Sequence, residues 1–336
     1  VNLPQTLDEE VVEGQLRGQR GDHDLTAGFE ARDETLHDPG LPGTASLARH
    51  RSAYLQDEWS ALRGLTVTAG LRHDNHGLFG SHWSPRLYAV WRPAPQWTVK
   101  GGASSGFKAP NLKQIVPGTR REGPNDFIGN PALRPEVSRS FEIGGAWQAG
   151  RRGAQLMVFD QRVDDLIDVR LVQAGPTPGT GTYTYENLAR ARLRGLEAAY
   201  AGPLSVHPPL PLHLPLHLHL SYTYLDATSG NGQRLDRRPR HAAAARLDAR
   251  SGPWRAGLQA EWQADQRLPA ATVGQPSVAA PSVALWGAHL ARQLPYGMEA
   301  TLAVTNLTQL RLADRSPLFT QVEWPRTWRL ALRGQW

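Results

Sequence analysis

The sequence predicts an all-β fold, a transmembrane antiparallel β-barrel, and three observations lead to that prediction. Apolar residues recur with a period of two, which is the repeat of a β-strand. The alternating segments run for about ten residues, longer than most strands of soluble proteins and long enough to cross a bilayer at a tilt. Short turns alternate with long polar connections, which is the layout of an outer-membrane barrel.

The composition excludes several other classes of protein. The 336 residues include 33 glycines and 26 prolines but no cysteine. The lack of cysteine excludes disulfide scaffolds, thiol nucleophiles, iron–sulfur clusters and cysteine-based zinc sites. No run approaches 18 consecutive apolar residues, so no transmembrane helix is expected. The mean hydropathy of −0.46 is typical of a soluble protein, yet a barrel with a polar lumen has the same property, because only every second strand residue meets lipid.

The alternation defines the expected strands. At the end of the chain, Trp328, Leu330 and Leu332 alternate with polar and small residues. The same pattern predicts about fifteen strands. They are expected near residues 10–19, 23–34, 51–60, 64–74, 84–92, 96–105, 137–148, 153–163, 192–202, 212–224, 240–249, 254–263, 281–292, 298–306 and 326–336.

The connections between these strands are of two kinds. Short turns are expected at 20–22, 61–63, 94–95, 150–152, 250–252 and 295–297. Long polar loops are expected near 37–50, 106–136, 164–190, 226–240, 265–280 and 307–325. Long loops on one side and short turns on the other predict an extracellular and a periplasmic end.

An odd number of strands is unusual, because single-chain bacterial barrels close with an even number and an open edge cannot face lipid. Either the count is off, or the N-terminal part of the barrel is missing. We expect residues 1–336 to form one partial, C-terminal barrel domain. A soluble propeller or solenoid is the alternative, but no blade-length repeat supports it.

Several stretches resemble TonB-dependent outer-membrane receptors, and the resemblance runs through essentially the whole chain in order. The most specific are GFKAPNL at 106–112 and GNPALRPE at 129–136. Others are GLRHD at 70–74 with WSPR at 83–86, YEN at 185–187 with ARLRGLE at 191–197, and VTNL at 304–307 with PRTW at 325–328. Within the family, the sequence is most similar to ferric enterobactin-type receptors for catecholate siderophores.

This resemblance implies a barrel of roughly 22 strands closed by an N-terminal plug, with energy delivered by TonB. This sequence shows neither a plug nor a TonB box, so it corresponds to the C-terminal portion of the barrel. The branch often has a cysteine pair in the loop corresponding to 106–136, and this chain has none.

The implied function is TonB-dependent import of a ferric siderophore across the outer membrane of a Gram-negative bacterium. The implied partners are the siderophore, TonB–ExbB–ExbD through the plug, outer-membrane lipid and lipopolysaccharide, and colicins or phage. Neither catalysis nor a resident cofactor is expected. No nucleic-acid partner is expected despite the net charge of +6, because no recognition helix, zinc ligands or aromatic platform is apparent.

A ferric catecholate complex is a compact trianion with aromatic rings, so its site needs cationic side chains and aromatic faces. The two basic loops near 106–136 and 226–240 provide such cations. The candidate ligand-binding residues are Lys108, Lys113, Arg120, Arg121, Phe127, Arg134, Arg237, Arg238 and Arg240, with Tyr185 and Trp83 as further aromatic partners. Binding of lipopolysaccharide phosphates is the other interpretation of these arginines.

Four alternatives concern other ligands or activities. Haem receptors of this family have a histidine between the two boxes, and residues 111–129 contain none, which favours a siderophore. GASSG at 102–106 formally matches the hydrolase motif around Ser104, but no helix is expected to follow it.

A passive porin is disfavoured by the long loops. His213, His217 and His219 predict a lumen-facing polar ladder rather than a metal site.

Overall fold

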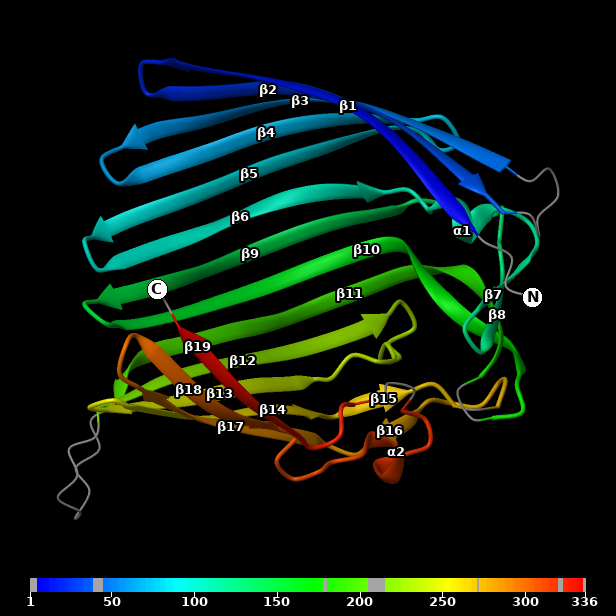
Figure 1. Cartoon of the computed structure of the whole chain (residues 1–336). Helices are drawn as coiled ribbons and strands as arrows, with labels where there is room; N and C mark the ends of the chain where they lie inside the picture. Colours follow the sequence, from blue (N-terminus) through cyan, green and yellow to red (C-terminus); the bar gives the residue numbers. More distant parts are fainter. Residues whose placement is uncertain are drawn as a thin grey trace.

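A computed structural model describes residues 5–38, 45–177, 180–204, 215–270, 272–319 and 323–334. Fifteen strands follow one another in a single antiparallel meander, each paired with the next (Figure 1). They are β1 (Thr6–Arg20), β2 (His23–His37), β3 (Ala45–Leu62), β4 (Leu65–His76), β5 (Gly80–Ala94), β6 (Trp97–Lys108), β9 (Glu136–Ala149), β10 (Arg152–Ala174), β11 (Gly181–Leu204), β12 (Leu216–Ser229), β13 (His241–Ser251), β14 (Trp254–Ala264), β17 (Val283–Gln293), β18 (Met298–Thr305) and β19 (Thr327–Gly334). Each predicted strand corresponds to one of these, so the predicted fold class is confirmed.

The remaining elements are short and lie in the long connections. β7 (Thr119–Glu122) and β8 (Asn125–Ile128) form a hairpin, as do β15 (Gln266–Leu268) and β16 (Val278–Ala280). The two helices, α1 (Leu112–Ile115) and α2 (Leu312–Arg315), have four residues each. Among the described residues, no helix is long and apolar enough to cross a membrane.

The two ends of the sheet differ as the sequence predicts. Tight turns join the strands at one end, on the left in Figure 1, and the long connections with α1, β7 and β8 lie at the other. Gly21 and Gly150 adopt φ of +59° and +56° in two of these tight turns. Two-residue hairpin turns require positive φ, which glycine adopts without a steric penalty.

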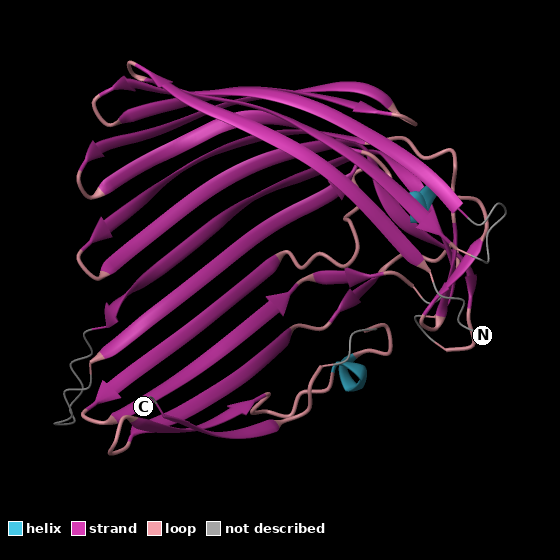
Figure 2. Ribbon diagram, turned by 45° about the horizontal axis from the view of Figure 1, so that its top comes forward, coloured by secondary structure: helices cyan, strands magenta, loops and turns pink. Residues whose placement is uncertain are grey.

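The sheet is curved about its long axis and open on one side (Figures 1 and 2). In the described ladders β1 pairs only with β2, and β19 only with β18. Both outer strands therefore leave backbone hydrogen-bonding groups without a strand partner. An open edge of this kind cannot face lipid, because lipid offers no hydrogen-bond partners.

The two faces of the sheet have different chemistry. On β19, Trp328, Leu330 and Leu332 are 60%, 80% and 66% exposed, on one face. The opposite register partners of Leu330 and Trp328 on β18 are the apolar Leu302 and Val304. Apolar side chains that are exposed in such continuous rows are the surface that lipid covers. We call this the outward face, and the other, which is polar, the lumenal face.

One predicted loop is wrong. Residues 164–190 are mostly strand, because β10 continues to Ala174 and β11 begins at Gly181. The cross-strand register stays the same from Asp164↔Arg190 to Leu171↔Tyr183, with one interruption at Asp165, whose φ is +56°. The polar composition of this segment suggests a loop, but the pairing partners stabilise it as a hairpin that extends beyond its neighbours.

Parts of some predicted elements lie outside the described residues. These parts are residues 212–214 of one expected strand, which include His213, and residues 335 and 336 of the last one. Of the expected loops, residues 39–44, 178–179, 271 and 320–322 are outside them as well.

The largest buried apolar cluster lies inside the loop-bearing end, not within the strands' membrane region. It joins Leu36 of β2 and Ala48 of β3 to Leu112 and Ile115 of α1, with Ile167 of β10 packed against it. The long connection 109–135 therefore spans the mouth from β2–β3 to β10–β11. Val116, Leu133, Phe79 and Tyr185 complete the cluster.

Gly129 provides a test of how this connection is held. A Cβ atom at Gly129 would lie 1.9 Å from the carbonyl oxygen of Val116, so no side chain fits there. We expect Gly129→Ala to push the two segments apart, at a cost of about 1–3 kcal/mol, and to accelerate proteolysis within 109–135. Gly18→Ala is the matched control, because nothing lies within 4 Å of its Cβ position. Equal cleavage rates in the two variants would contradict this account.

Asn306 provides a second test, in the last long connection. Its side chain accepts from the Leu310 N–H at 2.7 Å and donates to the carbonyls of Leu310 and Trp324 at 2.8 and 3.0 Å. Its φ of +49° also favours asparagine over alanine. We expect Asn306→Ala to cost about 1–3 kcal/mol, because buried groups lose their partners. The measurement is the urea midpoint, with the exposed Thr308→Ala as control; identical midpoints would refute the role.

Candidate functional site

The mouth connection begins with a short capped helix. Asn111 caps α1: its side-chain oxygen accepts from the Gln114 N–H at 3.0 Å, and the Gln114 side chain accepts from the Asn111 N–H at 3.0 Å. This reciprocal capping box satisfies two backbone donors at the start of the helix. It turns Leu112 and Ile115 into the buried cluster. The first family-like stretch, 106–112, therefore sets the direction of the connection.

The second family-like stretch is clamped to β10 and β11 by two asparagines. Asn130 donates to the carbonyl of Tyr185 at 2.8 Å. Asn187 accepts from the Arg134 N–H at 2.8 Å and donates to the carbonyls of Arg134 and Asp165 at 2.9 and 2.7 Å. These bonds satisfy backbone groups that no strand ladder reaches.

Glu136 is the third clamp, at the start of β9. It is 9% exposed, and its Oε1 accepts from Lys108 Nζ and from the Ile167 N–H, both at 3.1 Å. Lys108, at the end of β6, is therefore ion-paired with Glu136 at the start of β9 and joins the two ends of the connection. Arg134 is ion-paired as well, and its guanidinium lies 2.5 Å from Asp165.

An aromatic cluster lies beside the β10–β11 hairpin, where β8 continues the sheet next to β11. β8 pairs in parallel with residues 182–184 of β11 and brings Phe127 beside two tyrosines. The Phe127 ring stacks on Tyr183 at 5.5 Å and on Tyr185 at 5.8 Å between centroids. Burial raises the pKa of the Tyr185 hydroxyl above its usual range; Glu122 adds to this and Arg120 opposes it.

Arg120 of β7 stands directly opposite Phe127 of β8 and is 2% exposed. Its Nη1 donates to the Val116 carbonyl at 3.5 Å, while Nε and Nη2 are buried and have no hydrogen-bond partner. No carboxylate of the described residues forms an ion pair with it. A buried, unpaired guanidinium costs several kcal/mol. An anion that reached it would relieve that cost.

The other predicted cations fall into two groups. Arg240 is engaged: it lies 3.3 Å from Asp226 and 3.1 Å from Asp265. In the described part of the chain, the remaining four form no ion pair. These are Lys113, Arg121, Arg237 and Arg238, of which Arg238 donates to the Asp236 carbonyl at 3.2 Å.

Trp83 does not lie with the other candidates. It is on the outward face of β5, 57% exposed, with its ring 4.4 Å from that of His73. Register pairs His73↔Trp83 and Leu71↔Pro85 place it in line with the lipid-facing rows. The strand alternation places this ring on the outward face, apart from the other candidates, and its contact with the ligand stays a prediction.

The sequence analysis missed a histidine cluster on β3 and β4. The buried Asp74 accepts from His50 and from Arg72, both at 2.9 Å. His76 accepts from the Leu78 N–H at 3.2 Å and packs on Phe79. Burial, and then the charge of His50, hold the pKa of His76 below its ordinary value. The in-phase spacing of residues 72, 74 and 76 is the signal that was available.

The hydrolase alternative is not supported by the local structure. The GASSG stretch lies inside β6, where Ser104 pairs with Arg86 and Ser140 of the flanking strands. A nucleophilic serine of that motif needs a sharp strand-to-helix turn, which a continuous strand does not provide.

Comparison with known proteins gives several relatives. The chain is 33% identical over 257 residues to the iron-regulated outer membrane virulence protein of Vibrio cholerae, covering 72% of this chain and 38% of that protein. It is 32% identical over 277 residues to the ferric enterobactin receptor PirA of Pseudomonas aeruginosa, covering 73% of this chain and 35% of that protein. The chain thus spans little more than a third of the length of these relatives.

Solved structures show the same fold. The siderophore receptor PirA from Acinetobacter baumannii superimposes with a TM-score of 0.76 at 19% identity, over 98% of this chain and 55% of that one. The siderophore receptor PirA from Pseudomonas aeruginosa gives 0.74 at 24% identity, over 98% and 56%. Residues 7–307 match the family described as TonB dependent receptor-like, beta-barrel, and the chain belongs to this family.

Proposed function

We propose that the protein containing this chain is a receptor that binds a ferric siderophore of the catecholate class at the loop-bearing mouth and imports it with energy from TonB. The relatives named as ferric enterobactin receptors support the ligand class. The family is one of receptors and not of enzymes, which agrees with a mechanism of binding rather than bond-making. The outer membrane is the location of this family.

The observation that carries the proposal is the unpaired guanidinium of Arg120 beside the stacked rings of Phe127, Tyr183 and Tyr185. A ferric catecholate presents negative charge and aromatic rings on one compact body. The guanidinium offers donors to its oxygens, and the aromatic rings offer faces to its rings.

Access to Arg120 requires the β7–β8 hairpin to move, because the guanidinium is buried. The hairpin is joined to β11 by a short parallel ladder, Thr182↔Asp126 to Thr184↔Ile128. The Asn125 side chain also accepts from the Gly181 N–H and the Thr184 hydroxyl donates to the Ile128 carbonyl, both at 3.0 Å, so movement of the hairpin breaks these bonds as well. An anion that compensates the buried charge favours the rearranged state, and a ligand shifts such an equilibrium by its differential affinity.

The first encounter is electrostatic. Lys113, Arg121, Arg237 and Arg238 form no ion pair among the described residues and lie on the connections of the mouth. Unpaired cations raise the local concentration of an anionic ligand and its association rate. Import itself needs a plug and its contacts with TonB–ExbB–ExbD, which we propose by family analogy and not from residues of this chain.

Substitution of Arg120 tests the proposal. We expect Arg120→Gln to weaken binding of a ferric catecholate about ten- to a hundredfold, because a hydrogen bond to a charged group is worth about 1.5–3 kcal/mol. The stability of the unliganded protein should stay equal or rise, since an unpaired buried charge is removed. The measurement is quenching of tryptophan fluorescence in the full-length protein.

The matched control is Arg121→Gln, the exposed neighbour on the same strand, which should change the affinity little and mainly reduce the salt dependence of association. Equal affinities for the wild type and Arg120→Gln would overturn the site. Quenching by haem but not by the ferric catecholate would overturn the ligand class.

A further inference from the structure

The turn between β4 and β5, at residues 77–79, is built on the backbone and the side chain of His76. The Phe79 N–H donates to the His76 carbonyl at 3.1 Å, and the Leu78 N–H donates to His76 Nδ1 at 3.2 Å. A ring nitrogen that accepts a hydrogen bond uses its lone pair for it, so it carries no proton. The turn in this arrangement therefore requires the neutral form of the His76 imidazole.

Phe79 joins this turn to the connection that spans the mouth. Its ring lies 5.0 Å from the His76 ring between centroids, and it packs against the buried cluster that contains Leu112 and Ile115 of α1. These two residues are the apolar anchor of the connection 109–135 at its first end. The His76 imidazole is therefore coupled to that anchor through a single aromatic ring.

The nearest groups on β3 and β4 do not stabilise a positive charge on His76. His50 of β3 stands directly opposite it, with the two ring centroids 5.8 Å apart, and repels an imidazolium when it is itself protonated. Asp74, two residues back on the same face of β4, already accepts from His50 and from Arg72, both at 2.9 Å. The carboxylate of Asp74 is therefore engaged with two other donors.

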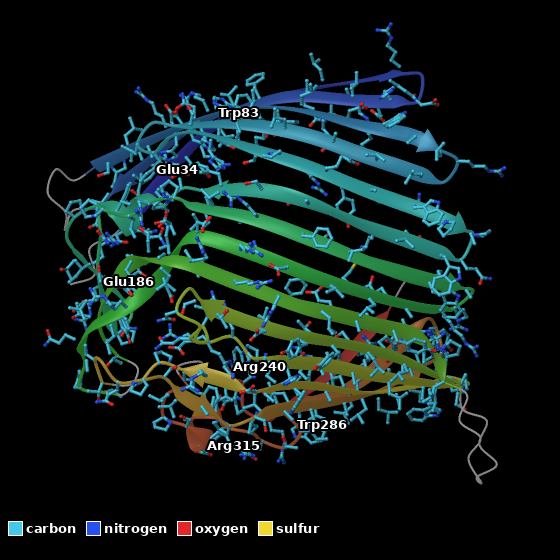
Figure 3. All side chains as sticks on the ribbon, turned by 180° about the vertical axis from the view of Figure 1, so that it is seen from behind. Glu34, Trp83, Glu186, Arg240, Trp286 and Arg315 are labelled. Atoms are coloured by element: carbon cyan, nitrogen blue, oxygen red, sulfur yellow. The ribbon has the colours of Figure 1, made fainter. Side chains whose placement is uncertain are left out.

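The carboxylates that β2 presents on the same face lie around an arginine. Arg32 stands opposite His50, and it lies 3.2 Å from Glu30 and 4.0 Å from Glu34. Figure 3 places Glu34 near the loop-bearing end of the sheet. Among the described residues, the charge that acts on the His76 ring is that of His50 and not that of these carboxylates.

β5 and α1 add no carboxylate to these surroundings. Gly80 is the register partner of His76 on β5, and the next residue of β5 on that face is His82, opposite Asp74. The charged side chain of α1 is that of Lys113, which is positive as well. A proton on His76 therefore adds a positive charge where no anion faces it.

Burial acts in the same direction. The His76 residue is 7% exposed, and burial, followed by the charge of His50, holds its pKa below the ordinary value of 6.5. When the turn opens, the ring meets water and the pKa returns toward that value. Because the open state then binds the proton more tightly, the closed turn is fully stable above about pH 6.5 and loses stability as the pH falls below it.

We propose that the β4–β5 turn is an acid-sensitive latch on the mouth: a proton from solvent on His76 Nδ1 breaks the bond from the Leu78 N–H, the turn withdraws Phe79 from the buried cluster, and α1 loses its anchor. An imidazolium has donors at both nitrogens, so the Leu78 N–H then meets another N–H. The latch goes beyond siderophore binding and involves no ligand, so this proposal and that for Arg120 can fail independently.

The test is hydrogen exchange of residues 109–118 in the full-length protein in detergent, without ligand, at pH 7.5 and 5.0, with rates corrected for the intrinsic effect of pH. We expect the corrected rate to rise about tenfold at pH 5.0, the order of change when one proton is linked to opening. His76→Gln should abolish the rise, because its side-chain oxygen still accepts from the Leu78 N–H but does not titrate. The matched control is His73→Gln, on the outward face of the same strand, which should respond as the wild type does.

Phe79→Ala tests the coupling to α1 without changing His76. It should raise the exchange of residues 109–118 already at pH 7.5 and remove most of its dependence on pH, because the anchor is then lost at both values. Heat-modifiable migration on gels reports whether each variant forms its barrel, and if His76→Gln does not fold, Phe79→Ala decides. A pH response that persists in folded His76→Gln overturns the proposal, as does wild-type exchange of Phe79→Ala at pH 7.5.

Discussion

The rest of this structure depends on one constraint, that a backbone in lipid must satisfy all its hydrogen bonds within the protein. The antiparallel meander meets this constraint strand by strand, with each ladder supplying the partners that water supplies elsewhere. Once the ladders form, side chains alternate between the two faces, and the register of one strand fixes the face of its neighbours. The apolar rows and the polar lumen both follow from that registration.

The same constraint explains why the mouth needs clamps of a different kind. The connection 109–135 leaves the ladder, so its backbone groups depend on side chains. Asn130, Asn187 and Glu136 supply those bonds and hold the connection to β10 and β11. These residues of the family-like stretches therefore shape the mouth. Arg120 stands out because two of its buried guanidinium nitrogens have no hydrogen-bond partner and it forms no ion pair within the described residues.

Positive charge and aromatic rings meet at one place in the mouth. The buried guanidinium of Arg120 lies on the strand opposite Phe127, whose ring stacks on two tyrosines of β11. The exposed cations of the same connection, such as Arg121, lie in water and have no such aromatic surroundings. Burial therefore distinguishes a cation that an anion can stabilise from cations that water already stabilises.

The sequence by itself determined the strands, because a period of two over about ten residues is a local property. Every expected strand is present, and the family-like stretches lie where they were expected. The spacing of Trp83, Pro85 and Leu87, every second residue, also contained the information that places Trp83 on the outward face. Within the long connections, the sequence could name the cations but not which of them are free.

Only the tertiary structure decided that question. Lys108, Arg134 and Arg240 meet carboxylates that lie 14 to 31 residues away in the chain, whereas Arg120 meets none. The tertiary structure also showed that β10 and β11 extend through a segment whose composition suggests a loop. It showed, too, that Arg139, Arg162 and Arg192 of three neighbouring strands lie opposite one another. The physical reason is the same in each case. The alternation of apolar and polar residues is a property of neighbouring residues, whereas charge compensation and cross-strand contacts depend on the register between segments that are distant in sequence.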